Sequence, residues 1–130
     1  MGKVQKKNNK AEWIEDVNAL IGQISKWGSQ ENWIVSQGMK TISEEALGDY
    51  QLPELHLRLP GGHLVVEPIA KTVMGADGRI DIYAFPALNR MFLILKRDQW
   101  RLKTDSGVNW PKPWNKKTFL ELAQLLTSPI

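Results

Sequence analysis

Residues 52–104 decide the fold, and they read LPELHLRLP GGHLVVEPIA KTVMGADGRI DIYAFPALNR MFLILKRDQW RLKT. At the start of this stretch, Leu55, Leu57 and Leu59 alternate with charged or polar residues. A period of two is typical of a β-strand with one face in the core and the other in water. We therefore expect a half-buried strand over residues 52–59.

Short sequences rich in glycine, proline and aspartate divide the rest of this stretch into further strands. The sequence predicts turns at 60–62, 75–78 and 86–89, and strands over 63–73, 79–85, 90–96 and 100–104. Such connections join antiparallel neighbours, because a parallel crossover needs about a dozen residues or more. The apolar run Met91–Leu95 does not alternate, which predicts a strand buried on both faces.

The segment before these strands has the pattern of an amphipathic helix. Its apolar residues recur at helical spacing from Trp13 to Trp27. Asn9 followed by Glu12 is a variant of the capping box that begins helices, and Gly28 is the residue type that most often ends them. A further strand is expected over 33–43, and then a short turn within 44–51.

A second amphipathic helix is expected near the end of the chain. Either Asn115 or Thr118 is placed to cap it, and apolar residues from Phe119 to Leu126 form its stripe. We expect both helices to cover the sheet face that carries Leu55, Leu57, Ile80 and Ile82. The predicted fold class is α+β: an antiparallel meander of five to six strands with an N-terminal and a C-terminal helix.

Composition limits the classes of protein to which this chain can belong. The 130 residues fit a single domain over 9–130, preceded by a basic tail over 1–8 that we expect to be flexible. No cysteine is present, which excludes disulfides and thiolate metal sites and fits a reducing compartment, so the cytoplasm is the expected location. The longest apolar run is far shorter than a membrane span, and no membrane partner is expected.

The strongest candidate for a binding surface lies late in the chain, where aromatic and basic residues alternate with prolines. Tryptophan and arginine dominate the energetics of protein interfaces, and proline stiffens the segment that presents them. The sequence therefore predicts a small non-enzymatic module that binds another protein, as an adaptor, an inhibitor or immunity-type domain, or an assembly subunit. The residues expected to bind are Trp100, Arg101, Lys103, Trp110, Lys112 and Trp114.

The same residues support two alternatives. Basic groups beside exposed aromatic rings track phosphates and stack on bases, which favours a nucleic-acid-binding protein. Trp110 and Trp114 are also placed to hold the last helix against the sheet, in which case they are structural. The choice depends on how far the rings are exposed.

A metal-dependent nuclease, in a degenerate form, is the enzymatic alternative. Glu67, Asp81 and Lys96 lie on three successive strands, and two carboxylates with a lysine are the groups that bind magnesium and activate water in many nucleases. The apolar pattern favours a hairpin around Asp77–Gly78 in which Ile69 and Val73 share a face with Ile80 and Ile82. That register places Glu67 and Asp81 on opposite faces and argues against the site, whereas a three-residue loop ending at Gly78 would shift the register by one and bring both carboxylates to one face.

The two histidines, His56 and His63, flank the turn at 60–62 and could face the same way. With Glu54 or Glu67 they have the chemistry of a metal site or a general base, although exposed histidines on a wet strand face are the commoner case. No nucleophile motif or phosphate-binding loop is present, and we expect neither a cofactor nor a metal.

Overall fold

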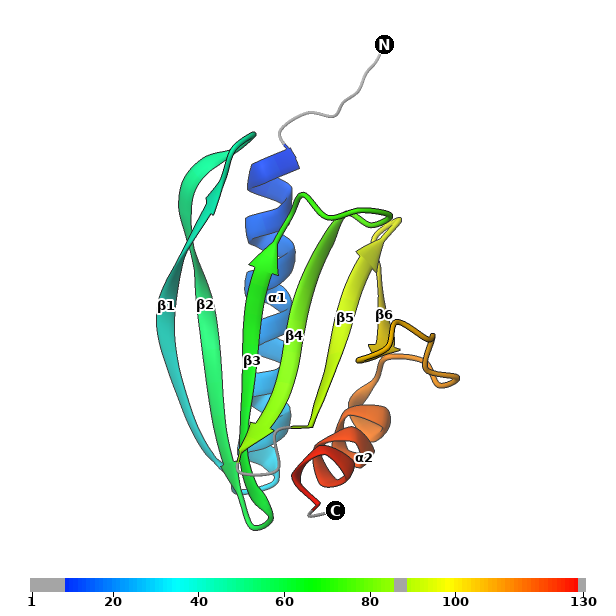
Figure 1. Ribbon diagram of the computed structural model, residues 1–130. Helices are drawn as coiled ribbons and strands as arrows, with labels where there is room; N and C mark the ends of the chain where they lie inside the picture. The colour runs from blue at the N-terminus through cyan, green and yellow to red at the C-terminus, as the bar shows by residue number, and fades with distance from the viewer. Residues whose placement is uncertain (1–8, 86–88, 129–130) are drawn as a thin grey trace.

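The computed structural model describes residues 9–85 and 89–128. Along these residues one helix comes before six strands and a second helix comes after them (Figure 1). The elements are α1 (Asn9–Gln30), β1 (Ile34–Glu44), β2 (Gly48–Leu59), β3 (Gly62–Ala70), β4 (Gly78–Phe85), β5 (Arg90–Lys96), β6 (Gln99–Thr104) and α2 (Lys116–Thr127). The strands form one antiparallel sheet in chain order, which confirms the predicted α+β meander. The tail predicted over 1–8 lies outside the described residues.

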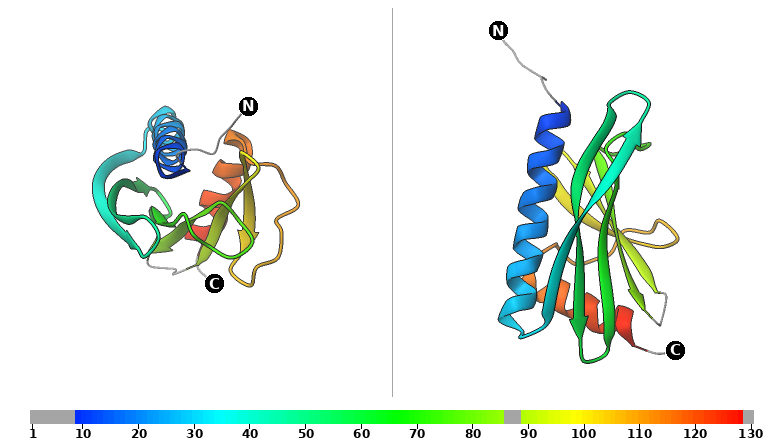
Figure 2. Two further views of the ribbon diagram at one scale, coloured as in Figure 1. Left: turned by 90° about the horizontal axis from the view of Figure 1, so that it is seen from above. Right: turned by 90° about the vertical axis from the view of Figure 1, so that its left-hand side faces the viewer.

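The sheet curves around the two helices (Figure 2). Helix α1 runs along the strands, and α2 lies across the end of the sheet where β5 begins (Figure 1). Residues of both helices join the alternate residues of the strands in one apolar core, as expected from the period-two pattern. The opposite sheet face is called the outer face below.

Helix α1 ends later than the sequence predicts. It continues through Gly28 to Gln30, and Asn32 takes the left-handed conformation with φ of 63°. The Trp33 amide donates to the Gly28 carbonyl at 3.0 Å, and the Asn32 amide donates to Ser29 at 3.0 Å, which is a Schellman motif. Gly28 instead allows α1 to pack closely against β2, because a Cβ at this position would lie 2.8 Å from the Leu57 side chain.

The structure also settles where α2 begins and how long the β1–β2 hairpin is. Asn115 is the N-cap of α2, since its side-chain oxygen accepts a hydrogen bond from the Thr118 amide at 2.8 Å. The hairpin between β1 and β2 is longer than predicted. Most of 44–51 pairs as strand, and only three residues, 45–47, connect Glu44 to Gly48.

Strand β5 is buried on both faces over Met91–Leu95, as predicted. Leu93 points into the core, whereas Phe92 points to the outer face, where no helix in the described part of the chain lies over it. The Arg79 guanidinium covers the Phe92 ring at 4.1 Å from its centre. Long polar side chains thus shield this part of the outer face.

The predicted register between β3 and β4 is wrong. Glu67 pairs directly with Asp81, so both carboxylates point to the outer face. The predicted register extended β3 to Val73 as one arm of a tight hairpin. Instead β3 ends at Ala70 after a register shift between Pro68 and Ala70, and residues 71–77 form a longer connection.

Candidate functional site: the surface around Trp110

The alternation of β6 divides the predicted binding residues between two faces. Trp100 lies on the core side, with its ring 6.2 Å from that of Trp13. Arg101 and Lys103 alternate with it and point to the outer face. The predicted cluster of aromatic and basic residues is therefore two adjoining surfaces rather than one.

A tight turn after β6 brings the connector back along the strand. The Gly107 amide donates to Thr104 at 2.8 Å, and Gly107 has the positive φ, 89°, that glycine adopts without strain. The Thr104 amide then donates to Val108 at 2.8 Å, and the Trp110 amide donates to Leu102 at 2.9 Å. These backbone bonds fix Trp110 beside the edge of β6.

Trp114 holds the connector against the helices. Its ring lies 5.5 Å from Trp27 and 5.8 Å from Phe119, and its Nε1 donates to Gln23 at 3.2 Å. Trp100, Trp110 and Trp114 are all half-buried and packed against the core. They are therefore both structural and partly accessible.

A groove of about 470 Å³ runs between the edge of β6 and this connector. We call it the β6 groove. It holds every predicted binding residue except Lys103, and it is lined by Gln99, Trp100, Arg101, Leu102, Asn109, Trp110, Lys112, Pro113 and Trp114. Lys112 is already paired with Glu121 at 2.8 Å, which leaves Arg101 as the cation without a carboxylate partner in the described part of the groove.

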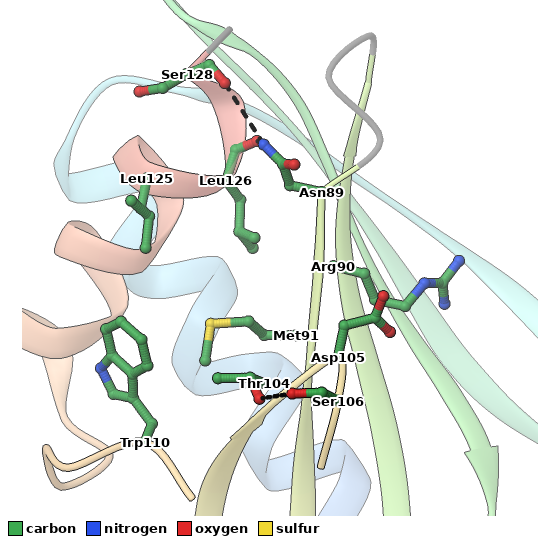
Figure 3. A pocket seen from close by; sticks show the side chains of 10 residues that line it. All are labelled: Asn89, Arg90, Met91, Thr104, Asp105, Ser106, Trp110, Leu125, Leu126 and Ser128. Atoms are coloured by element: carbon green, nitrogen blue, oxygen red, sulfur yellow. Dashed lines mark hydrogen bonds between the residues drawn. The ribbon is translucent and has the colours of Figure 1, made fainter. Parts of the chain in front are cut away.

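A larger hollow of about 650 Å³ lies on the other side of Trp110, between α2 and the ends of β5 and β6 (Figure 3). We call it the α2 pocket. Its apolar wall comes from Met91, Trp110, Leu125 and Leu126, and its rim from Asn89, Arg90, Thr104, Asp105, Ser106 and Ser128. The Asn89 amide group donates to the Leu126 carbonyl at 3.0 Å and so attaches the end of α2 to the sheet.

The α2 pocket was not among the sites predicted from the sequence. The position of Leu125, a leucine outside the predicted apolar stripe of its helix, was the one indication of an apolar surface there, and 52% of its surface is exposed in the structure. A single exposed leucine is common and does not indicate a site. Here Leu125 indicates an apolar pocket because Met91 and Trp110 line the same hollow in the folded chain (Figure 3).

The outer face carries a third hollow, about 320 Å³, which we call the basic groove. It is lined by Gly75, Ile94, Lys96, Arg97, Arg101, Lys103 and Asn109. Among the residues that the structure describes, no carboxylate lies within salt-bridge distance of its four cations. Arg101 and Asn109 line both this groove and the β6 groove, so the two hollows meet at the edge of the sheet.

The candidate nuclease residues are brought together only in part. Glu67 forms an ion pair with Lys40 at 2.6 Å, and Asp81, which is 3% exposed, accepts from Arg79 at 2.7 Å and from Arg90. Lys96 lies apart from them in the basic groove. Both carboxylates are thus already neutralised by neighbouring cations.

Burial alone acts to raise the pKa of Glu67, but the hydrogen bond and charge of Lys40, together with the Tyr83 hydrogen bond and the charge of Arg90, outweigh it and lower the pKa. Burial and a hydrogen bond to Glu67 raise the pKa of Tyr83 to about 12. Over residues 9–85 and 89–128, no group of three or more histidine, aspartate or glutamate side chains is arranged to hold a metal ion. The outer-face carboxylates Glu67 and Asp81 form ion pairs with Lys40, Arg79 and Arg90.

The histidines do face one another. His56 Nδ1 lies 3.2 Å from His63 Nε2, and His56 Nε2 lies 2.8 Å from a Glu54 carboxylate oxygen. Burial lowers the pKa of His63, and the charges of His56 and Arg58 lower it further. Each ring nitrogen in these contacts already has a hydrogen-bonding partner.

Comparison with known proteins found no relative. No family model matches the chain. No curated protein and no solved structure matches it significantly. In the described part of the chain, no helix has the length and apolar character to cross a membrane.

Proposed function

We propose that the chain is a non-enzymatic module that binds a segment of another protein at the surface around Trp110. One observation carries this proposal: Trp110 is the shared wall of the α2 pocket and the β6 groove. A partner segment that lies over Trp110 would reach both hollows at once. An adaptor, an inhibitor or immunity-type protein, or an assembly subunit would all use such a surface.

The chemistry of the two hollows supports a peptide ligand. The α2 pocket offers Met91, Leu125 and the Trp110 ring to an apolar side chain. Backbone hydrogen bonds hold Trp110 in place before any partner arrives, so little conformational entropy is lost on binding. Half-buried tryptophans of this kind are the usual energetic centre of protein interfaces.

The test uses random dodecapeptides displayed on phage and selected on the purified chain. We expect peptides that bind the wild-type protein and lose about 30-fold or more in affinity with Trp110→Ala. The control is Met39→Ala, an apolar truncation on β1, whose side chain is 60% exposed at the opposite edge of the sheet. It should leave the affinity unchanged.

Circular dichroism of both variants separates lost binding from lost folding. A binding surface elsewhere would be shown by peptides that bind Trp110→Ala as tightly as the wild type. If no peptide is enriched over a column without protein, the proposed function itself is wrong.

Nucleic-acid binding is the second candidate, and the four cations of the basic groove, which have no carboxylate partner among the described residues, favour it. A fluorescent single-stranded 20-mer of thymidylate tests it by anisotropy. Binding that weakens steeply between low and moderate salt, and that Lys96→Glu abolishes, would make nucleic acid the ligand. A metal-dependent nuclease has less support, because the carboxylates of Glu67 and Asp81 are held in ion pairs.

A further inference from the structure

The partner segment can be described more closely, on the basis of the proposed function. We propose that it is an acidic, extended segment that adds as a strand to the open edge of β6, with apolar side chains toward the β6 groove and carboxylates toward the basic groove. Three observations support this occupant: the free backbone groups of the edge, the two-sided chemistry of the strand, and the charge of the outer groove.

The first observation concerns the backbone of β6. The carbonyl of Leu102 faces away from β5, since it accepts from the Trp110 amide. Alternate residues of a strand direct their N–H and C=O groups to the same edge, so the N–H and C=O of Trp100 also face away from β5. In the described residues no backbone group pairs with Trp100 on that side, and Trp100 lines the β6 groove.

The connector covers only the later half of this edge. It pairs with β6 at Leu102 and Thr104 and leaves the N–H and C=O of Trp100 open to the groove, because Gln99 and Arg101 direct theirs toward β5. An unpaired edge next to a groove is the geometry that accepts an added strand, in which main-chain hydrogen bonds give affinity and alternate side chains give specificity. The open backbone groups of Trp100 provide one donor and one acceptor for a short added strand.

The second observation is that β6 separates two kinds of side chain. Trp100 and Leu102 point to the core side, where Trp110 continues the apolar surface. Arg101 and Lys103 point to the outer side. An added strand has the same period of two, so its own side chains would alternate between an aromatic surface and a cationic one.

The third observation is charge. Lys3, Lys6 and Lys7 account for the whole net charge of +3, so the rest of the chain is neutral overall. The basic groove nevertheless gathers Lys96, Arg97, Arg101 and Lys103 without a carboxylate partner among the described residues. Such a concentration of one sign of charge selects and steers a ligand of the opposite sign.

An acidic peptide fits these features better than a nucleic acid does. The Trp100 ring contacts Trp13 and the Trp114 ring contacts Trp27 and Phe119, so part of each ring is already covered and less of it is open to stacking by bases. The open N–H and C=O of the β6 edge also match the backbone of a peptide, which offers both acceptors and donors, whereas a phosphate offers acceptors alone.

The sequences of the selected phage peptides test the pattern. We expect aspartate or glutamate at every second position over a short stretch, alternating with apolar residues, and depletion of lysine and arginine. Selected peptides without an acidic bias would overturn this inference while leaving the proposed function in place. Absence of any selected peptide would overturn both, and tight binding of the thymidylate 20-mer in place of peptides would show that the groove serves nucleic acid.

Charge reversal tests the cationic side. Arg101→Glu is expected to weaken binding of a selected acidic peptide about tenfold or more, and added salt should weaken the wild-type complex in the same direction. The matched control is Lys26→Glu, the same kind of change on the exposed side of α1. Equal affinities for the two variants would overturn the role of the basic groove.

Backbone methylation tests the added strand itself. A selected peptide is synthesised with a single N-methyl group placed at each position in turn. If the peptide pairs with β6, affinity falls where the methyl group replaces the N–H that donates to the Trp100 carbonyl, and it persists at the two neighbouring positions, whose N–H groups face away from the edge. Uniform loss or uniform tolerance along the peptide would show that it does not bind as a strand.

Discussion

The carboxylate of Glu44 joins three parts of the fold. It accepts hydrogen bonds from the hydroxyl of Tyr50 and from the backbone amides of Lys71 at 2.9 Å and Thr72 at 2.8 Å. The Trp13 indole donates in turn to the Tyr50 hydroxyl at 3.1 Å. One side chain thus attaches the connection after β3 to the β1–β2 hairpin, and through Tyr50 to α1.

This arrangement predicts a loss of stability in acid. Burial acts to raise the pKa of Glu44, but the hydrogen bonds from Tyr50, Lys71 and Thr72 outweigh it and hold the pKa below the ordinary value of 4.5. A carboxylate with a lowered pKa in the folded state stabilises that state above its unfolded pKa. The contribution is lost as the pH falls through the folded value.

Glu44→Gln is therefore expected to lower the free energy of unfolding at pH 7 and to flatten its dependence on pH below about 4.5. Urea denaturation at a series of pH values measures both effects. Glu45→Gln, on the exposed turn next to it, is the control and should retain the wild-type slope. A slope for Glu44→Gln that equals the wild type would show that the contacts of this carboxylate do not depend on its charge.

At the scale of elements, the contact between α1 and β4 depends on a glycine. Gly78 begins β4, and a Cβ built there would lie 2.1 Å from the ring of Trp13. The sequence around Gly78 predicts a turn residue that tolerates positive φ. In the structure the positive φ belongs to Gly75, at 79°, and Gly78 is instead the flat surface on which the Trp13 ring lies.

Gly78→Ala is expected to destabilise the fold by about 1–3 kcal/mol, because Trp13 has to move within a filled core. Gly38→Ala provides the matched control, since Gly38 lies on exposed β1 and nothing is within 4 Å of its added Cβ. Chemical denaturation of the two variants gives the comparison. Similar stabilities would mean that the helix shifts at little cost.

Features that depend on local sequence patterns could be predicted, and features that depend on contacts between distant residues could not. Strand order and helix faces followed from local periodicity and turn residues, as the alternation of Leu55 and Leu57 shows. The pairing of Glu67 with Asp81 could not be predicted in this way, because it depends on a register shift after Pro68 that no local sequence pattern marks. The α2 pocket was also hidden, because Met91 and Leu125 meet only in the folded chain.

At the scale of the whole molecule, one core connects all the elements. Phe119 of α2 contacts Trp27 of α1 at 5.7 Å between ring centres; Phe119 belongs to the same buried cluster as the strand residues, and Trp27 packs against that cluster. We therefore expect a single cooperative unfolding transition, in which tryptophan fluorescence and far-ultraviolet circular dichroism coincide.

Phe119→Ala should shift both signals together and cost about 3–5 kcal/mol. Leu125→Ala, on the exposed side of the same helix, should leave stability nearly unchanged while weakening peptide binding through the α2 pocket. Two separate transitions in Phe119→Ala would show that α2 is not part of the cooperative unit.

The chain order of the sheet has a consequence for synthesis. Each strand pairs only with the strands before and after it, so the hairpins are able to form one after another as the chain leaves the ribosome. The connector with Trp110 and helix α2 follow the strands in the chain, and they supply walls of the α2 pocket and the β6 groove. A chain still being made would have most of its sheet but no complete α2 pocket or β6 groove, so the proposed partner binding would begin only after α2 has left the ribosome.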